Sequence, residues 1–479
     1  MDTKNVRVRF APSPTGFMHL GNVRAALINF LFAQQKHGTF ILRIEDTDQQ
    51  RNIDPAGTQI MSDLQWLNLI YTEGPALGGP FAPYYQSERQ PIYQKQLEFL
   101  KQHELVYRCF CSVEELEKKR QRQLALKTPP RYDRACLALS QQEVTQLLNN
   151  NTPFIWRFKL DYNNPVEFYD LAHKTMHFDL SHFSDIPLTR QDGSFTFMFA
   201  NFVDDMVMKI THVFRGEDHL TNTAAQTALY RAFNAPLPLF YHLPIIGNQQ
   251  GKKLSKRDFG FSLNDLRDAG YLPEALCNYL GIIGRSFEHE IMTLEQLAQA
   301  FGFDDLSSTG QIRYDLEKLR WVNHQWMMHY DTQKLVELCR PYLEAAYPQL
   351  VDLPAEKLTE LIKFAQQEMV TLKESVEVLE FYFKIPVFSR DFLEHFHFGN
   401  HKFLLHKLIP LLIDQLSSPD TAVKSAQALC KEEKASVKDI FTILRIALTG
   451  KGQGPGIKDL LVLLPADQSR ARLLRLLDY

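Results

Sequence analysis

The apolar positions near the start of the chain change their period. Residues 6–10 alternate as a half-buried strand does, and the prolines and glycine of 12–16 then provide turn chemistry. From Asn22 onward, apolar residues recur at helical spacing as far as residue 31. The pattern predicts a strand, a tight turn and a helix, with His19 just before the helix.

Later apolar patterns predict further elements. Strand-like runs occur at 154–158, at 206–214 and at 241–246, whereas Pro273 stands near the start of a helical run. Beyond about residue 325, strand signals fade and helical periods take over. The patterns divide the chain into 1–80, half of a doubly wound α/β domain; 81–190, an insertion; 191–250, the second half; 251–324, which turns helical; and 325–479, which is all helical.

The composition is that of a globular protein with several domains. The 479 residues are 45% hydrophobic, carry a net charge of −3 and include six cysteines. The start lacks the design of a signal peptide, and no apolar stretch approaches the ~20 residues of a membrane span. So few cysteines predict a reducing, cytoplasmic environment. A nucleic-acid surface would require basic residues gathered on one face, since the net charge is slightly negative.

Two short stretches carry residues suited to phosphate chemistry. In the first, 9–22, His19 and Gly21 stand at the predicted helix start, where unpaired N–H groups and the helix dipole favour an anion. The second, 252–257, carries four cations in six residues. Separately they are typical of a capped strand–turn–helix and of a solvated basic loop. Together they predict two sides of a site for a nucleoside triphosphate.

These stretches resemble the HIGH and KMSKS motifs of class I aminoacyl-tRNA synthetases, the second in a KLSKR form. Three more, 43–48, 201–205 and 211–220, are similar to bacterial-type glutamyl-tRNA synthetases, and the likeness runs nearly end to end. The resemblance implies an α/β, doubly wound (Rossmann-like) catalytic domain. Within it, 81–190 would be an inserted α+β domain that binds the tRNA acceptor end. All-α stem-contact (251–324) and anticodon-binding (325–479) domains would follow.

The resemblance also implies the reaction and its participants. L-Glutamate is activated by ATP to glutamyl-adenylate and then transferred to the 3′-terminal adenosine of tRNA, with Mg²⁺ on the phosphates. The implied catalytic residues are His19, Lys253 and Lys256. The implied ATP contacts are His19, Gly21, Asp218, Lys253, Ser255, Lys256 and Arg257.

Glutamate recognition requires cations for two carboxylates and an acceptor for one ammonium group. By the resemblance, Arg215 takes the side-chain carboxylate, since a charged fork selects glutamate over glutamine. Glu45 is suited to the α-ammonium group. The implied pocket residues are Arg9, Ala11, Ser13, Glu45, Phe197, Asn201 and Arg215. For the segment 43–48 taken alone, a surface salt-bridge cluster is the alternative.

Two positions depart from the family pattern. Phe197 stands where the family often has tyrosine, and the change removes a hydroxyl donor and acceptor from the implied pocket. Asn22 replaces the second histidine of HIGH, as is common in this branch. The first departure leaves open a divergent paralogue with a shifted tRNA preference.

The inserted segment contains a spaced set of cysteines. Cys109 and Cys111 are one residue apart, and Tyr132 and Cys136 follow at a distance. Three thiolates fall short of the four strong ligands usual for a structural zinc site. Some bacterial glutamyl-tRNA synthetases have a similar Cys-x-Cys…Tyr-x-x-x-Cys zinc site, so the resemblance implies Zn²⁺ on these four residues. Three free thiols are the alternative. For the cysteines at 277, 339 and 430, simple packing is expected.

The helical remainder suggests RNA contact only through a local enrichment in cations. The Gly-rich turn 450–456 is suited to close approach of a backbone. The cations concerned are Lys424, Lys431, Lys434, Lys438, Arg445 and Lys451. The resemblance implies a monomer and a glutamate-accepting tRNA partner, and leaves a glutamine-accepting tRNA open.

Other functions compete with glutamate–tRNA ligation. A glutaminyl-tRNA synthetase would have a β-rich anticodon region, which the helical periods after 325 oppose. A shortened glutamyl transferase that modifies a tRNA base would lack that region. A catalytically silent RNA-binding paralogue would have lost ATP-site residues, yet His19, Gly21 and Lys256 are present.

Overall fold

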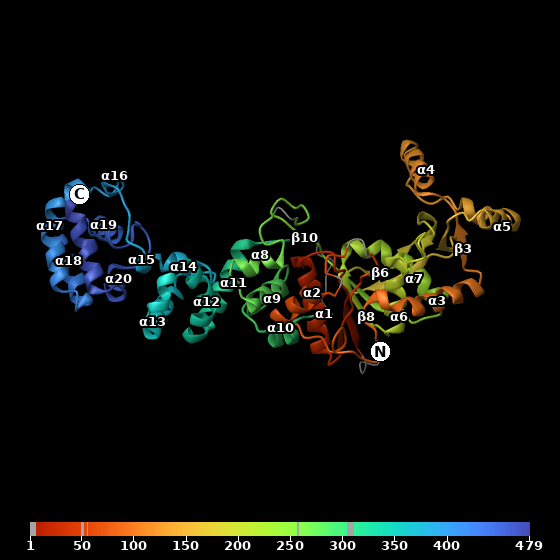
Figure 1. The fold of residues 1–479 in the computed structure, drawn as a ribbon, viewed down its shortest axis with the longest axis horizontal. Helices are drawn as coiled ribbons and strands as arrows, with labels where there is room; N and C mark the ends of the chain where they lie inside the picture. Colours follow the sequence, from red (N-terminus) through yellow and green to blue (C-terminus); the bar gives the residue numbers. More distant parts are fainter. Residues whose placement is uncertain (1–5, 49–51, 55, 256–257, 304–310) are drawn as a thin grey trace. The chain divides into compact units, whose positions relative to one another are not determined.

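The computed structural model describes residues 6–48, 52–54, 56–255, 258–303 and 311–479 (Figure 1). These residues form two compact units. The first comprises the described residues up to 267 together with 273–322, and the second comprises 268–272 with 323–479. Among the described residues, no helix is long and apolar enough to cross a membrane.

Parallel strands form the centre of the first unit. Strands β1 (Arg7–Phe10) and β2 (Thr39–Leu42) pair in parallel, as do β8 (His212–Gly216) and β9 (Leu239–Leu243). The Thr211 amide donates to the Arg7 carbonyl at 3.0 Å, and the Leu239 amide donates to the Thr211 carbonyl. Thr211, just before β8, therefore places the β8–β9 pair beside the β1–β2 pair, with β8 next to β1 across about two hundred residues of sequence. Strands β5 (Val166–Asp170) and β6 (Lys174–Phe178) continue beyond β9.

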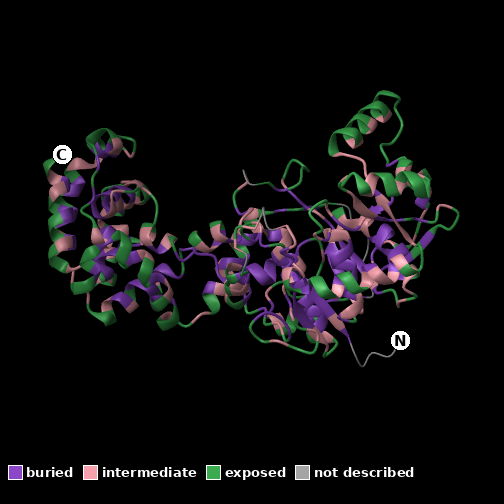
Figure 2. Ribbon diagram, turned by 45° about the vertical axis from the view of Figure 1, so that its right-hand side comes forward, coloured by how far each residue is buried: buried purple, intermediate pink, exposed green. Residues whose placement is uncertain are grey.

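Helices cover the central strands. Helix α1 (Leu20–Gln35) follows β1 and buries most of its residues, because it packs against strands and against helices α9 and α10. The other helices of this region are α2 (Thr58–Trp66), α3 (Gln90–Gln102), α6 (Phe197–Val207) and α7 (Leu220–Ala232). Buried residues concentrate on the central strands and α1 (Figure 2). This confirms the predicted doubly wound α/β class.

Much of the segment 81–190 forms a small antiparallel sheet with two exposed helices. Strands β3 (Val106–Cys109), β4 (Ile155–Phe158) and β7 (Ile186–Pro187) pair in that order. Helices α4 (Val113–Ala125) and α5 (Gln141–Asn149) bury no residues, and both begin with a serine capping box. Local capping and helix-forming side chains therefore stabilise them more than packing does.

The rest of the first unit is mostly helical. Helix α9 begins at Pro273, as predicted. Strands β10 (Ile246–Gly247) and β11 (Ile312–Arg313) form a short parallel pair. The helices are α8 (Leu263–Asp268), α9 (Pro273–Ile282), α10 (Leu294–Ala300) and α11 (Leu316–His329), the last of which continues into the second unit.

The second unit is helical throughout its described residues, as the periodicity predicts. Its cores are built from leucines and isoleucines such as Leu361, Leu408 and Ile443, which are fully buried. The helices are α12 (Thr332–Ala346), α13 (Ala355–Ala365), α14 (Glu374–Val378), α15 (Glu380–Phe383), α16 (Arg390–Glu394), α17 (Phe398–Asp414), α18 (Pro419–Glu432), α19 (Val437–Thr449), α20 (Ile457–Leu463) and α21 (Ala466–Arg475).

The strand predicted at 206–214 is wrong in its first part. Helix α6 extends through Val207, and β8 starts only at His212. Both the end of the helix and the strand are apolar, and a short apolar run does not distinguish the two states by period. The run at 241–246 likewise splits, because β9 ends before Pro244 and β10 begins at Ile246.

The first residue of β8 makes the fold sensitive to acid. Burial lowers the pKa of His212 to about 4, and its ring packs 4.6 Å from that of Phe32. The unfolded chain binds this proton near pH 6.5 and the folded chain does not, so stability is lost as pH falls from about 6.5 toward 4. When the pH falls from 7 to 5, the free energy of unfolding should decrease in both proteins. We expect the decrease to be about 1 to 2 kcal/mol smaller in a His212→Phe variant than in the parent. Urea unfolding at the two pH values measures this, and equal losses would contradict it.

Candidate functional site

His19 caps helix α1 with one nitrogen and leaves the other available. Its Nδ1 accepts from the Asn22 amide at 3.2 Å, and the Asn22 side chain accepts from the His19 amide. Burial, with the nearby Lys253 ammonium, lowers the pKa of His19 below its usual value. The ring is therefore neutral near pH 7, with its proton on Nε2. A Cβ on Gly21 would lie 3.0 Å from the imidazole, so this glycine makes room for the cap.

The chain after the lysine-rich stretch packs beside this helix start. The Leu20 amide donates to the Phe261 carbonyl at 3.1 Å, and the Leu263 amide donates to the Met18 carbonyl at 2.9 Å. The rings of His19 and Phe261 lie 5.2 Å apart. The two sequence stretches that predicted a common site, about 240 residues apart, therefore meet in space.

Two of the lysine-stretch residues have defined partners. Lys253 Nζ lies 3.2 Å from Asp218 Oδ2, and both side chains are exposed. Ser255 contacts a different carboxylate, since its amide and hydroxyl both donate to Asp258. Lys256 and Arg257, predicted as a catalytic residue and an ATP contact, lie outside the described residues.

Arg9 and Arg43 belong to a buried ionic cluster. Arg9 Nε donates to Asp205 Oδ1 at 3.1 Å, and Arg43 donates to the same carboxylate at 2.7 Å. Burial opposes ionisation of Asp205, but the Arg9 and Arg43 guanidiniums outweigh it and hold its pKa below the usual range. Arg43 is fully buried, so the alternative of a surface salt-bridge cluster is wrong for it.

Asp204 forms the second half of the cluster. Its carboxylate accepts from Arg89 Nε at 2.6 Å, from Tyr93 at 2.8 Å and from Gln86 at 2.9 Å. The Arg43 guanidinium lies 3.7 Å from it. With Glu45, which Arg43 contacts at 2.8 Å, the cluster contains three guanidiniums and three carboxylates and is balanced in charge.

Glu45 presents one carboxylate oxygen to the protein. Its Oε1 accepts from Arg43 at 2.8 Å, from Asn201 at 2.7 Å and from Gln86 at 3.4 Å. No described residue donates a hydrogen bond to Oε2. Burial raises the pKa of Glu45, although Arg43 opposes the shift. A cationic ligand group at Oε2 would complete the set of partners of this carboxylate.

Arg215 is a buried cation outside the balanced cluster. It is 7% exposed, and no carboxylate of the described residues lies within the 4.0 Å of a salt bridge. Its Nη2 donates to Thr223 and, at 2.9 Å, to Gln226, whereas its Nε is buried without a hydrogen-bond partner. Burial and the neighbouring Arg9 lower the pKa of Arg215 to about 10, which leaves it charged near pH 7. Such an arrangement favours an anionic ligand.

Hydrogen bonds connect Arg215 to the other predicted pocket residues. Gln226 accepts from Arg215 and donates to Asn201 at 3.0 Å, and Asn201 donates to Glu45. The structure thus brings Arg215, Asn201 and Glu45 into one network, with Arg9 beside it. The sequence alone singled out neither Gln226 nor its connecting role, because nothing in its local pattern marks it.

The remaining predicted pocket residues lie around this network. Phe197 begins helix α6, and its ring is 5.8 Å from that of His219. Ala11 is half-buried and Ser13 is exposed, in the loop that follows β1. The Glu45 amide donates to the Pro12 carbonyl at 2.9 Å, which holds this loop against the Glu45 segment. No hydrogen bond joins Ser13 to another described residue.

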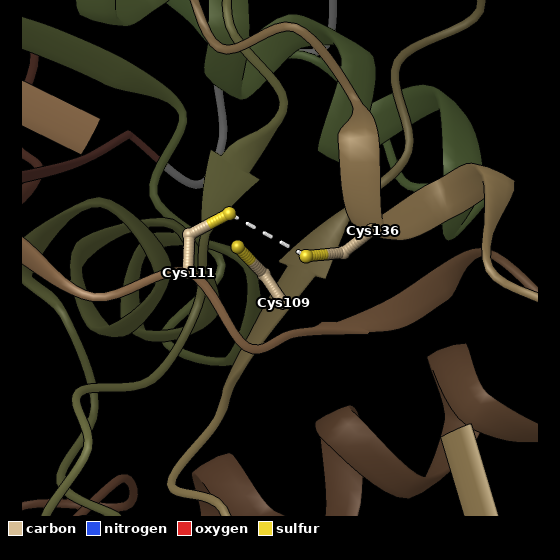
Figure 3. Close-up of side chains that lie close together, drawn as sticks. All are labelled: Cys109, Cys111 and Cys136. Atoms are coloured by element: carbon tan, nitrogen blue, oxygen red, sulfur yellow. Dashed lines mark hydrogen bonds between the residues drawn. The ribbon is translucent and has the colours of Figure 1, made fainter. Parts of the chain in front are cut away.

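The three cysteines of the inserted segment converge (Figure 3). The sulfurs of Cys109, Cys111 and Cys136 all lie within 4.8 Å of one another. The Tyr132 hydroxyl is 3.3 Å from Cys109 Sγ and 3.9 Å from Cys111 Sγ. Hydrogen bonding from Cys136 lowers the pKa of Cys109 to about 4. Zinc–sulfur bonds of about 2.3 Å would fit a sulfur triangle of this size.

The cysteines outside the inserted segment do not converge. Cys277, Cys339 and Cys430 are separately buried, as expected from packing.

The second unit contains a cavity of about 850 Å³ against its Gly-rich turn. Lys438, Thr442 and the turn 449–455 line it, with aromatic rings including Phe392 and Phe396. Arg445 donates to the carbonyls of Pro455 at 2.8 Å and Gly452 at 3.1 Å. Because Arg445 uses these N–H groups to hold the turn, fewer of them are available to contact RNA than the sequence predicts.

The chain matches two family models in succession. Residues 5–321 match the class I tRNA synthetase (E and Q) catalytic domain, and residues 334–477 match an anticodon-binding domain. The chain therefore belongs to the class I tRNA synthetases of the glutamate and glutamine branch, and the resemblance stated from the sequence is confirmed.

Named relatives of the chain are glutamate–tRNA ligases. Those of Bacillus velezensis and Clostridioides difficile are 36% and 37% identical to it, over 98% and 95% of this chain and 99% and 95% of theirs. A glutamate–tRNA ligase 2 of Nitrosococcus oceani is 36% identical over 100% of this chain and 99% of its own. The crystal structure of a glutamate tRNA ligase from Elizabethkingia meningosepticum, in complex with its amino acid, superimposes with a TM-score of 0.86 at 31% identity, covering 99% of both chains.

Proposed function

We propose that this chain is a glutamate–tRNA ligase, which activates L-glutamate with ATP and transfers it to the 3′-terminal adenosine of tRNA. The observation that carries the proposal is Arg215, a buried cation without a carboxylate partner, beside Arg9 and connected to Glu45. Two cations and one acceptor are what glutamate requires. The full-length similarity to glutamate–tRNA ligases supports it.

Each charged group of glutamate has a partner in this arrangement. The Arg215 guanidinium receives the side-chain carboxylate, and the Glu45 Oε2 atom receives the α-ammonium group. Arg9 keeps its Nε on Asp205 and its Nη1 on the Phe214 carbonyl, and directs Nη2 to a carboxylate. Phe197, Ala11 and Ser13 complete the pocket by shape. Glutamine would leave the buried charge of Arg215 uncompensated, so it is rejected.

The ATP phosphates lie at the start of helix α1 in this proposal. His19 donates from Nε2, and Gly21 permits the cap that fixes this imidazole. Lys253 exchanges Asp218 for a phosphate oxygen, because their pair is exposed and therefore weak. Ser255, Lys256 and Arg257 follow Lys253 closely in the sequence and are proposed as further ATP contacts. Mg²⁺ supplies further charge neutralisation when it accompanies ATP.

The chemistry requires positioning and charge stabilisation. An oxygen of the glutamate α-carboxylate attacks the α-phosphorus of ATP, the bond to the β-phosphate oxygen breaks, and pyrophosphate leaves. A ribose hydroxyl of the tRNA terminus then attacks the acyl carbon, and AMP leaves as the ester forms. Lysine ammonium groups and His19 stabilise the charge that builds on the phosphates in the first step.

Zinc bound by Cys109, Cys111, Tyr132 and Cys136 would join the two ends of the segment that carries helix α4. That helix buries no residue, so the metal would supply the tertiary support that packing does not. Three sulfurs and a phenol oxygen at these separations form a four-coordinate donor set.

Metal analysis tests this zinc site. We expect about one zinc per chain in the purified protein, and loss of that zinc in a Cys109→Ser variant, since a serine hydroxyl is a far weaker ligand than a thiolate. Elemental analysis after dialysis measures it. Cys430→Ala, at a buried cysteine far along the sequence, is the matched control and should keep its metal. Equal metal content in the two variants would contradict the site.

The other domains are proposed to hold tRNA. The segment 81–190 would bind the acceptor end, 251–324 the stem and 325–479 the anticodon. The cavity beside 449–455 is lined by Lys438 and Lys451 together with Glu368 and Glu377, so its aromatic rings, more than its charge, suit it to an RNA base. We infer a cytoplasmic monomer.

Aminoacylation with labelled glutamate tests the function. Purified glutamate-accepting and glutamine-accepting tRNAs are assayed separately. Charging of the first alone means a discriminating ligase, and charging of both means a relaxed one. Charging of the second alone means a specialised paralogue. No charging by correctly folded protein would overturn the proposal.

A further inference from the structure

A series of buried hydrogen bonds connects Arg215 to a distant carboxylate. Arg215 Nη2 donates to the hydroxyl of Thr223, Thr223 Oγ1 lies 2.7 Å from His242 Nε2, and His242 Nδ1 lies 2.7 Å from Asp170 Oδ2. Asp170, Thr223 and His242 are each fully buried. None of the three belongs to the predicted ATP or glutamate contacts, and they come from strands β5 and β9 and helix α7.

The donors in this series of hydrogen bonds all point in the same direction. Asp170 is an acceptor, so His242 carries its proton on Nδ1 and leaves Nε2 to accept. Burial lowers the pKa of His242, which keeps it neutral in this role. The Thr223 hydroxyl has two possible acceptors, the His219 carbonyl at 3.2 Å and His242 Nε2 at 2.7 Å. The shorter distance assigns its proton to Nε2, and an oxygen lone pair accepts from Arg215. In each of these three hydrogen bonds, the donor therefore lies on the Arg215 side and the acceptor on the Asp170 side.

Asp170 is anchored so that it cannot move toward Arg215. Its Oδ1 accepts from the amides of Ala172 and His173 at 2.9 and 2.8 Å and from the His173 ring at 2.9 Å. Its Oδ2 accepts from both the amide and the ring of His242. The carboxylate offsets only part of the buried Arg215 charge, because two neutral side chains separate the two groups. A direct ion pair would instead compete with a ligand carboxylate for the guanidinium.

We propose that Asp170, His242 and Thr223 are positioning residues that hold the Arg215 guanidinium for a carboxylate on the amino-acid side chain and thereby set the preference for glutamate over glutamine. The inference rests on the proposed function and deepens it. Asp170 lies on β5, within the inserted segment, and pairs with Phe240 of β9. The inserted segment thus contributes strands β5 and β6 to the central sheet and, through Asp170, a charge to amino-acid selection.

We call Asp170, His242 and Thr223 the relay. Thr223→Val tests the relay with little change in side-chain volume. It removes the hydroxyl, so Arg215 loses one buried partner and His242 Nε2 loses its donor. Because hydrogen bonds to charged groups contribute about 1.5–3 kcal/mol, we expect the KM for glutamate to rise about tenfold to a hundredfold. The KM for ATP should stay unchanged. Thr223→Ser keeps a hydroxyl and should restore the parental KM.

A matched control lies one turn along the same helix. Thr227 is also buried, but its hydroxyl donates at 2.8 Å to the Thr223 carbonyl and is not part of the relay. Thr227→Val should leave the KM for glutamate unchanged. If Thr223→Val does not fold, Thr223→Ala removes the same hydroxyl with less bulk and makes the same prediction.

Competition by glutamine separates positioning from general loosening of the pocket. Glutamine lacks the side-chain charge, so its inhibition constant should not change in Thr223→Val while the KM for glutamate rises. An equal loss for both amino acids, or an unchanged KM for glutamate, would overturn the relay. Failure of the parent protein to charge tRNA with glutamate would instead overturn the proposed function, so the two failures are distinguishable.

Discussion

Replacing Arg215 by methionine is expected to abolish glutamate activation while leaving the protein folded. Methionine approximates the length of the side chain but has no charge, so the side-chain carboxylate of glutamate would be buried without a partner. Truncating one member of a buried, hydrogen-bonded charge pair typically costs about 2–5 kcal/mol, so we expect kcat/KM for glutamate to fall by about thirtyfold to several thousandfold. Tritiated or radiolabelled glutamate in an aminoacylation assay measures this.

The stability of the same variant gives an independent reading of the site. Arg215 is buried without a carboxylate within salt-bridge distance among the described residues, so its removal takes away a desolvated charge along with two hydrogen bonds. We therefore expect the free energy of unfolding to change by no more than about 1 kcal/mol. Arg231→Met, on the same helix as Gln226, is the control, because the exposed hydrogen bonds of Arg231 go to the backbone carbonyls of Asn164 and Pro165 and not to the pocket network. Equal activity of the two variants would show that Arg215 does not bind the substrate.

Replacing Asp204 by asparagine is expected to destabilise the first unit more than any other single change considered. Asp204 is fully buried and accepts from Arg89, Tyr93 and Gln86, with Arg43 at 3.7 Å. Asparagine keeps the shape but removes the charge, which leaves three guanidiniums against two carboxylates. Breaking a buried ion pair in this way costs about 3–5 kcal/mol.

Urea unfolding of the Asp204→Asn variant measures this loss. Glu117→Gln on helix α4 is the matched control, because it also neutralises one carboxylate of an arginine pair. The Glu117 and Arg120 side chains are each about half exposed, so that pair contributes little. A shift in the urea midpoint for Asp204→Asn no larger than that for Glu117→Gln would contradict the view that the cluster supports the pocket.

The local predictions succeeded where neighbouring residues determine the structure. The strand at 6–10, the turn and the helix capped by His19 are all within about thirty residues, and their signals are periodicity and capping chemistry. Pro273 at the start of α9 has the same kind of local cause. The prediction at 206–214 was wrong because a buried helix end and a buried strand present the same apolar surface.

The pocket could be predicted only in part. The resemblance supplied Arg9, Glu45, Asn201 and Arg215, but not their different electrostatic states. Glu45 lies in an ion cluster, whereas Arg215 has no partner carboxylate within salt-bridge distance in the described structure. Which charges are balanced depends on distances between residues up to two hundred positions apart, and no sequence period encodes them.

The amino-acid sequence by itself determined the α/β class, the helical remainder, the two stretches that we predict to bind phosphates and the spacing of the four candidate zinc ligands, because each depends on residues close together in the sequence. Tertiary structure alone decided that Asp204 and Asp205 neutralise the arginines and that Asp170, His242 and Thr223 form a relay to Arg215. The physical reason is that burial and pairing set the energy of a charge, and both depend on segments that only the folded chain brings together.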